Sequence, residues 1–128
     1  MKISNFKFSN PQLVKLNFEA NENGKFDRET DFIDISISNN IHKENENEAV
    51  VELEIVIGEN TTDSPFSISL VIGAQFRLDD TIEETTFDRL LQVNAPAVLL
   101  SYARPIVSSI TTQAGMKPLN LPFLNFTK

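Results

Sequence analysis

The sequence predicts a single α+β domain over residues 1–128, built from a four-stranded antiparallel sheet and a long, Pro-broken C-terminal helix packed on one face. Two observations support this fold class. Up to about residue 78, apolar and polar residues alternate in four separate runs, which is the pattern of half-buried strands. After that point, apolar residues recur at helical spacing. A chain of 128 residues with 41% apolar and 23% charged residues is long enough and apolar enough to bury a core.

The four alternating runs cover residues 14–20, 32–38, 51–57 and 66–78, and short polar segments join them in sequence. The first run could begin earlier in the chain, because Ile3, Phe6 and Phe8 precede it. The fourth run is the longest, and a strand of about a dozen residues would span roughly 40 Å. The charged segment between the second and third runs, residues 39–47, is predicted to be the turn of a hairpin. One face of the resulting sheet is apolar and needs a cover.

The only segment that can supply this cover follows the fourth run. Thr81 and Glu84 have the spacing of a capping box, which predicts a helix start there. The apolar stripe that follows is interrupted at Asn94-Ala95-Pro96, so we expect a first helical segment before Pro96 and a second one over residues 97–114.

Pro105 lies inside the second helical segment, where it removes a backbone hydrogen bond and should kink the helix. Packing of the apolar stripe should outweigh the local cost of about 3 kcal/mol. Gly115 is well suited to end the helix.

The tail after Gly115 contains two prolines, which exclude a regular helix, and five large apolar residues between 119 and 126. Burying each such side chain is worth about 1.5–3 kcal/mol, so the tail should lie against something. It either packs on its own domain or walls an apolar groove for a ligand or another chain. Seven residues are candidates for lining such a polypeptide-binding groove: Met116, Leu119, Leu121, Pro122, Phe123, Leu124 and Phe126.

Composition and charge exclude several classes of function. The absence of cysteine excludes disulfides, thiolate catalysis and Cys-type metal sites. A net charge of −7 without a basic cluster argues against a nucleic-acid partner. No run is long enough to predict a membrane span, and the start MKISNFKFSN does not have the pattern of a signal peptide. We therefore expect a cytoplasmic protein.

The residues that could carry chemistry are few. His42 is the only histidine, and its polar, charged neighbours predict a solvated surface residue rather than a catalytic or metal-binding one. Asp79-Asp80 and Glu83-Glu84 could hold a cation, but acidic residues at a helix N-terminus explain them equally well. The four glycines form no phosphate-binding loop. We expect no enzymatic activity and no cofactor.

The C-terminal third resembles the SecB family of protein-export chaperones. The likeness rests on Tyr102-Ala103-Arg104 after Asn94-Ala95-Pro96, and on Leu119-Asn120-Leu121 followed by the apolar segment 122–126. Phe18-Glu19-Ala20 is similar to the family's motif at the end of its first strand. Gly73 with Phe76 is similar to the family's fourth-strand pattern.

This resemblance implies a homo-oligomer, a dimer or a tetramer, that holds non-native polypeptides in apolar grooves without ATP and passes preproteins to SecA. It places the tail at the wall of the polypeptide-binding groove. It assigns four residues to packing in the oligomer or the helix layer: Ile68, Leu70, Ile72 and Tyr102. It also makes Glu19 a possible contact with a partner.

The sequence also departs from the family pattern. The resemblance leads one to expect an acidic residue where Lys15 stands. It also leads one to expect the acidic and apolar residues that help dock SecA where Ser69 and Ser67 stand. The chain as printed ends at Lys128, so we expect a short form without the family's second helix and SecA-contacting tail.

Three functions therefore stay open: a holdase for non-native chains, a chaperone dedicated to an antitoxin or another single client, and an oligomeric scaffold or small-ligand binder that shares only the fold.

Overall fold

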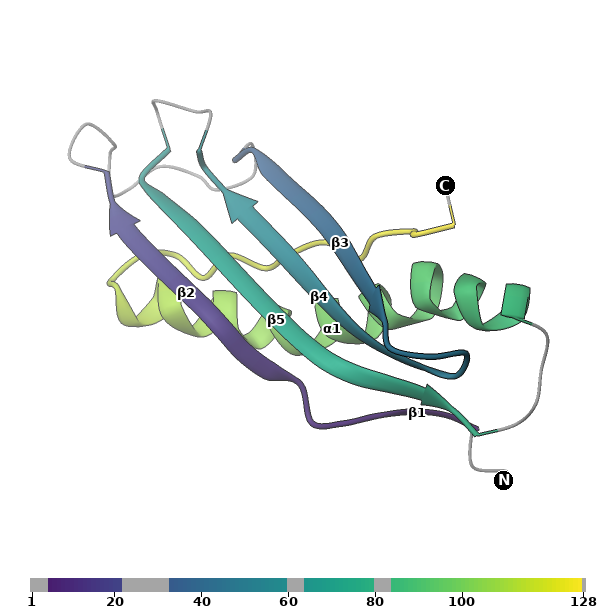
Figure 1. The fold of residues 1–128 in the computed structure, drawn as a ribbon. Coiled ribbons are helices and arrows are strands. Elements are labelled where there is room, and N and C mark those ends of the chain that lie inside the picture. The colour runs from purple at the N-terminus through teal and green to yellow at the C-terminus, as the bar shows by residue number, and fades with distance from the viewer. Residues whose placement is uncertain (1–4, 22–32, 60–63, 80–83, 128) are drawn as a thin grey trace, which may run out of the picture.

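The structure is a computed structural model that describes residues 5–21, 33–59, 64–79 and 84–127. Within these ranges it contains an antiparallel sheet and one helix, which confirms the predicted α+β class. The strands are β1 (Phe6–Phe8), β2 (Gln12–Ala20), β3 (Ile35–Lys43), β4 (Glu48–Ile57) and β5 (Phe66–Leu78), and the helix is α1 (Glu84–Gln113). Figure 1 shows α1 lying across one face of the sheet.

The sheet has five strands because the predicted first strand is divided in two. Both β1 and β2 pair with β5, β1 with residues 76–78 and β2 with residues 66–73. Between them, the hydroxyl of Ser9 accepts a hydrogen bond from the backbone N–H of Gln75 at 2.9 Å, and the Ser9 N–H donates to the Gln75 carbonyl. A register shift at Leu13/Lys15 within β2 adds a bulge. The prediction that Phe6 and Phe8 could extend the first strand was therefore only partly right, because they form a separate strand that pairs with the same neighbour, β5.

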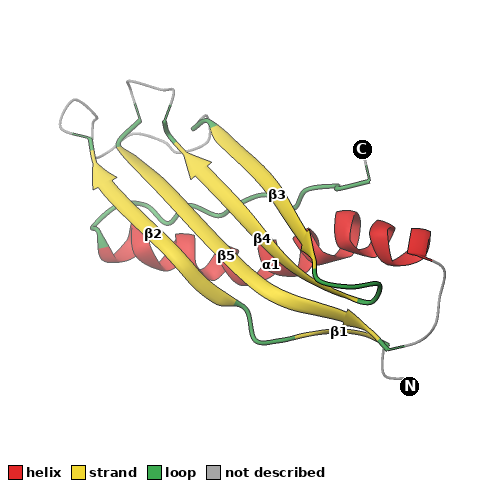
Figure 2. Cartoon of the chain, viewed as in Figure 1, coloured by secondary structure: helices red, strands yellow, loops and turns green. Residues whose placement is uncertain are grey.

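The spatial order of the strands differs from their order in the chain. β3, β4 and β5 are neighbours joined in sequence, but β2 pairs with β5 rather than with β3 (Figure 2). β2 and β3 therefore lie on opposite edges of the sheet. This is a Greek-key arrangement.

β3 is longer than predicted, and the expected charged turn over residues 39–47 was wrong in its first half. The strand continues to Lys43, so His42 lies on β3, exposed, and not in a turn. Two polar side chains on the apolar face of β3 find partners on α1. Asn39 Nδ2 donates to the Leu91 carbonyl at 3.3 Å, and Lys43 Nζ lies 2.9 Å from Asp88 Oδ1. These long-range partners stabilise a strand that local sequence does not predict.

The helix is also longer than predicted. The predicted break at Pro96 was wrong, because α1 runs unbroken through both Pro96 and Pro105. Pro96 is buried, so packing against the sheet offsets its local cost. The predicted cap residue Thr81 lies outside the described residues, as do Ile3 and Phe32.

The core lies between the sheet and α1. Every second residue of β4 and β5 is buried against the helix, including Leu53, Ile55 and Leu70 at 0% exposure. Seven of the buried positions on α1 recur at intervals of four: Phe87, Leu91, Ala95, Leu99, Ala103, Val107 and Thr111. Because a helix turns about 100° per residue, a strict four-residue repeat advances by about 40° at each step. The buried stripe therefore winds around α1, and its C-terminal end needs a cover other than the sheet.

Candidate functional site

The tail, residues 114–127, supplies that second cover. At the end of α1, Gly115 has φ +81° and its N–H donates to the Thr112 carbonyl, while the Met116 N–H donates to the Thr111 carbonyl. This geometry is the left-handed termination that glycine favours. The chain then turns back along the helix, as Figure 1 shows for the yellow segment.

Two residues of α1 hold the tail backbone. The buried hydroxyl of Thr111 accepts a hydrogen bond from the Leu119 N–H at 3.0 Å and donates to the Val107 carbonyl at 2.9 Å. About two turns earlier on the helix, Arg104 Nε donates to the Leu121 carbonyl at 2.8 Å. Arg104 and Thr111 project from the same side of α1, because seven residues are close to two full turns. The tail is therefore fixed to the helix at two points.

The structure divides the seven candidate groove residues into two groups. Met116, Leu119 and Leu121 are buried in the chain's own core, at 8%, 5% and 0% exposure, and Phe126 is half-buried against that core. Pro122, Phe123 and Leu124 are exposed. The first half of the tail thus packs on its own domain, and only the second half presents apolar surface to solvent. Whether that surface walls a groove stays a prediction.

Phe123 is the most exposed large apolar residue that the structure describes, at 79%. The guanidinium carbon of Arg104 lies 3.9 Å from the centroid of its ring, which is a cation–π stack. Arg104 therefore holds both the backbone before Phe123 and one face of its ring.

The opposite flank of α1 has a separate apolar surface next to β2. An open cleft of about 330 Å³ lies between Leu16 on β2 and the C-terminal half of the helix, where Pro105, Ile106 and Ile110 contribute to its wall. Further along the same sheet edge, Phe8 meets the ring of Tyr102 edge-on, with centroids 6.2 Å apart. The exposed apolar residues on this flank are Phe8, Leu13, Val14 and Tyr102.

The other residues predicted for packing or contact occupy different places. Ile68, Leu70 and Ile72 are buried under α1 of the same chain, so Tyr102 is the exposed member of that group. Glu19 lies on the outward face of the sheet opposite Ser67, beside a shallow hollow of about 650 Å³. Its contact with a partner stays a prediction.

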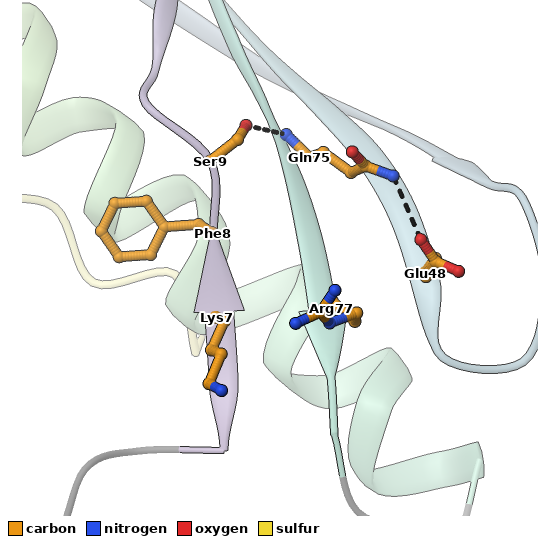
Figure 3. Close-up of a pocket in the computed structure, with 6 residues that line it drawn as sticks. All are labelled: Lys7, Phe8, Ser9, Glu48, Gln75 and Arg77. Atoms are coloured by element: carbon orange, nitrogen blue, oxygen red, sulfur yellow. Dashed lines mark hydrogen bonds between the residues drawn. The ribbon is translucent and has the colours of Figure 1, made fainter.

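A smaller hollow of about 300 Å³ lies where β1, β5 and the start of β4 meet (Figure 3). Its polar groups bond to one another: Gln75 Nε2 donates to Glu48 Oε2 at 3.2 Å, and the Gln75 N–H donates to the Ser9 hydroxyl. Phe8 points away from these groups in Figure 3. The arrangement joins strand ends and brings no nucleophile next to a base.

The two cationic side chains beside this hollow, Lys7 and Arg77, both form ion pairs with Asp79. Lys7 Nζ lies 2.6 Å from Asp79 Oδ2, and Arg77 Nε lies 2.7 Å from Oδ1. The hydrogen bonds from Lys7 and Arg77 lower the pKa of the Asp79 carboxyl below its usual value. Of the acidic residues considered for cation binding, Asp80 and Glu83 lie outside the described residues. Among the described residues, no group of three or more His, Asp or Glu side chains is arranged to hold a metal ion.

No helix in the described part of the chain is long and apolar enough to cross a membrane.

Comparison with known proteins agrees with this architecture. The family described as preprotein translocase subunit SecB matches residues 5–128. The protein-export protein SecB of Orientia tsutsugamushi (strain Boryong) is 27% identical over 127 residues, which cover 98% of this chain and 75% of the relative. The SecB of Rickettsia typhi is 35% identical over 96 residues, which cover 73% of this chain and 62% of the relative.

Two solved structures share the fold. A SecB-like chaperone of Mycobacterium tuberculosis, in complex with a peptide from an antitoxin, superposes with a TM-score of 0.71 at 17% identity, over 94% of this chain and 91% of that one. A protein of unknown function from Streptococcus agalactiae gives a TM-score of 0.59 at 18% identity, over 92% and 97% of the two chains. Since the SecB family matches nearly the whole chain, this protein belongs to the SecB family of protein-export chaperones.

Proposed function

We propose that this protein is a holdase that binds extended, apolar segments of non-native polypeptides in the cytoplasm without using ATP. The observation that carries the proposal is the second half of the tail. Phe123 and Leu124 are exposed at 79% and 40%, yet the backbone just before them is fixed to α1 through Arg104. Apolar side chains held in water on an ordered segment are typical of a binding surface.

The partner is proposed to be a polypeptide rather than a small ligand. The hollows near the surface are open and shallow, whereas small-molecule sites enclose most of their ligand. Family membership supports a chaperone over an oligomeric scaffold that shares only the fold. A polypeptide partner is also compatible with this fold, since the SecB-like structural neighbour that shares it was solved with an antitoxin peptide bound.

We also propose that the protein forms a dimer or a tetramer through the flank of α1 next to β2. That flank exposes four large apolar residues, Phe8, Leu13, Val14 and Tyr102, beside the outer edge of β2, which pairs with no second strand in the described part of the chain. An unpaired edge strand next to apolar surface favours pairing with another chain. Light scattering during size-exclusion chromatography would test the oligomeric state, and a monomer at micromolar concentration would contradict this part of the proposal.

We do not propose that this protein delivers its clients to SecA. The outward face carries Lys15, Ser67 and Ser69 at positions where the resemblance leads one to expect acidic and apolar contacts. The opposing residue Glu19 remains a candidate partner contact, and binding of purified SecA with a Glu19→Lys variant as control would test it.

The proposed function is tested by mixing the protein with a chemically denatured substrate and following light scattering after dilution. A holdase should suppress aggregation at about one oligomer per substrate chain, without nucleotide. Unchanged aggregation at this ratio would refute it. Suppression of several unrelated substrates supports a general holdase, whereas suppression of a single client supports the dedicated chaperone.

A further inference from the structure

β1 is attached to the sheet by few interactions. It has three residues and pairs with residues 76–78 of β5, whereas β2 has nine residues and pairs with residues 66–73. In the part of the chain that the structure describes, no second strand pairs with the other edge of β1. Short segments at a sheet edge open locally at a lower free-energy cost than core strands. β1 is therefore the strand that should separate from the sheet most easily.

The pairing with β5 is interrupted between β1 and β2. Asn10 and Pro11 lie opposite no residue of β5, and Pro11 has no N–H to donate. Just before them, the Gln75 N–H donates to the side-chain hydroxyl of Ser9 at 2.9 Å. β1 and β2 are thus separate segments on the same edge of β5, and β1 can leave that edge while β2 stays paired.

The outward face of β1 is held by a weak anchor. Lys7 Nζ lies 2.6 Å from Asp79 Oδ2, but the Lys7 side chain is 50% exposed. An exposed ion pair contributes little to stability, because water and salt screen it. Asp79 also bonds to Arg77, so its carboxylate keeps a cationic partner if β1 leaves. One backbone bond, from the Asp79 N–H to the Asn5 carbonyl, adds to this anchor.

The inward face of β1 carries two aromatic rings that cover apolar surface. Phe6 stacks on Phe76 with centroids 5.4 Å apart and meets Phe87 edge-on at 6.4 Å. Phe8 also packs against Phe76, at 5.9 Å, and meets Tyr102 at 6.2 Å. Phe76 and Phe87 are buried in the structure. β1 therefore contributes to the cover over this end of the core.

Removal of β1 would leave a slot with two kinds of binding group. One is the backbone edge of β5 over residues 75–79, whose N–H and carbonyl groups would be open to another strand. The other is the apolar surface around Phe76 that Phe6 and Phe8 now cover. β1 itself shows what fits the slot: an extended backbone with a large apolar side chain at every second position. An unfolded chain can present the same pattern.

We infer that β1 is an internal competitor at a second polypeptide-binding site, and that a client segment displaces β1 and pairs with β5 in its place. The inference rests on the proposed holdase function and adds a site that is separate from the tail. The observed affinity of the slot is its intrinsic affinity reduced by the fraction of chains in which β1 has left. A weaker hold on β1 should therefore strengthen client binding.

The probe is a fluorescent peptide with the sequence of residues 4–10, Ser-Asn-Phe-Lys-Phe-Ser-Asn, whose binding to the full chain is followed by anisotropy. The control peptide, Ser-Asn-Lys-Phe-Phe-Ser-Asn, has the same composition, but its two rings point to opposite faces of a strand. It should bind about tenfold more weakly or worse, since only one ring can enter the slot. Phe6→Leu in the protein should strengthen binding of the first peptide by about twofold to tenfold, because the chain's own strand loses its aromatic pairs.

A disulfide between β1 and β5 would lock the slot. Lys7 and Arg77 are directly opposed, and Cα atoms in such pairs lie about 5.5 Å apart or less, within the range of a disulfide. The chain has no cysteine of its own, so Lys7→Cys with Arg77→Cys introduces the only possible bridge within the chain. The oxidised form should show no measurable binding of the peptide, and reduction should restore binding. Both forms are the same polypeptide, so differences in folding between variants do not enter the comparison.

His42→Cys with Val50→Cys is the matched control, because this opposed pair joins β3 to β4 and leaves β1 unlocked. Its oxidised and reduced forms should bind the peptide equally well. Equal peptide affinity of the oxidised and reduced forms of the β1–β5 pair would overturn the inference, as would equal affinity of the unmodified chain and Phe6→Leu.

An unfolded model protein, measured in parallel, separates the inference from the proposed function. If the unmodified chain binds this protein but neither it nor Phe6→Leu binds the peptide, the inference is wrong and the holdase stands. If the unmodified chain binds neither ligand, the result counts against the proposed function itself.

Discussion

Leu121 and Phe123 are only two positions apart, yet substitution of each should have a different consequence. Leu121 is fully buried in the core, and its backbone carbonyl accepts a hydrogen bond from Arg104. Replacement of a buried Leu by Ala removes buried apolar surface and leaves a cavity, at a cost of about 2–5 kcal/mol. We expect Leu121→Ala to lower the free energy of unfolding by an amount in this range.

Phe123→Ala should leave the fold almost unchanged. The ring is 79% exposed, so its removal loses little burial, and the cation–π contact is worth about 0.5–1 kcal/mol at an exposed site. The same substitution should weaken binding of an unfolded client, because it removes the proposed contact surface.

Thermal melts followed by circular dichroism separate the two cases. For a chain of this size, 1 kcal/mol corresponds to a shift in Tm of about 3–6 °C. Leu121→Ala should therefore lower Tm by about 6 °C or more, and Phe123→Ala by less than about 6 °C. If Leu121→Ala has the same Tm as the unmodified chain, the first half of the tail is not part of the core. The division of the tail into a buried and an exposed half would then be wrong.

Three other predictions follow from single residues. Gly58 has φ +77°, and a Cβ there would clash with the backbone oxygen of Phe66, whereas Gly115 has φ +81° in open space. In urea unfolding, Gly58→Ala should therefore cost more stability than Gly115→Ala, which should cost about 1 kcal/mol, and equal costs would contradict the steric argument. Thr111→Val removes the acceptor of the Leu119 N–H, and the unpaired buried group should cost about 1–3 kcal/mol in the same experiment, so an unchanged midpoint would argue against this anchor. The lowered pKa of Asp79 means that its contribution to stability is present near neutral pH and is lost as the pH falls through the folded-state pKa. The hydrogen-exchange protection factors of the β1 amides, which are corrected for the intrinsic pH dependence of exchange, should therefore fall at acidic pH in the unmodified chain, and an identical pH profile in Asp79→Asn would refute this role.

Alternation of apolar and polar residues predicted β4 and β5 well, because both strands lie in the middle of the sheet with one face fully covered. It failed at the end of β3, where Asn39 and Lys43 occupy the apolar face. Their partners lie on α1, 52 and 45 residues further along the chain, and a local pattern contains no information about them. Pairing of β2 with β5 is non-local in the same way.

Local helix propensity also led to a wrong prediction for the helix, namely a break at Pro96. Pro96 was taken as a break, but it is buried, and tertiary packing outweighs the local cost. The sequence did contain a signal for the longer helix, because Ala95 continues the four-residue repeat of buried positions from Leu91 to Leu99. The winding of that repeat also explains why the tail must cover the end of α1.

The candidate site was predicted only in part. The apolar content of the tail indicated that it lies against something, and both the core and the groove-wall interpretation were open. The structure places Met116, Leu119 and Leu121 in the core, and leaves Phe123 and Leu124 exposed. Arg104 belongs to the Tyr102-Ala103-Arg104 triplet that carries the family resemblance, but no pattern predicted that it anchors the tail, since an Arg on an amphipathic helix is usually only a solvated side chain.

The central claim is that the protein recognises the non-native state of a chain through apolar contacts. The most direct test measures its affinity for one labelled protein in two forms, a permanently unfolded variant and the native fold, in the absence of nucleotide. We predict micromolar or tighter binding of the unfolded form, weakened by Phe123→Ala, and no measurable binding of the native form. Equal affinity for both forms, or no binding of the unfolded one, would contradict the account.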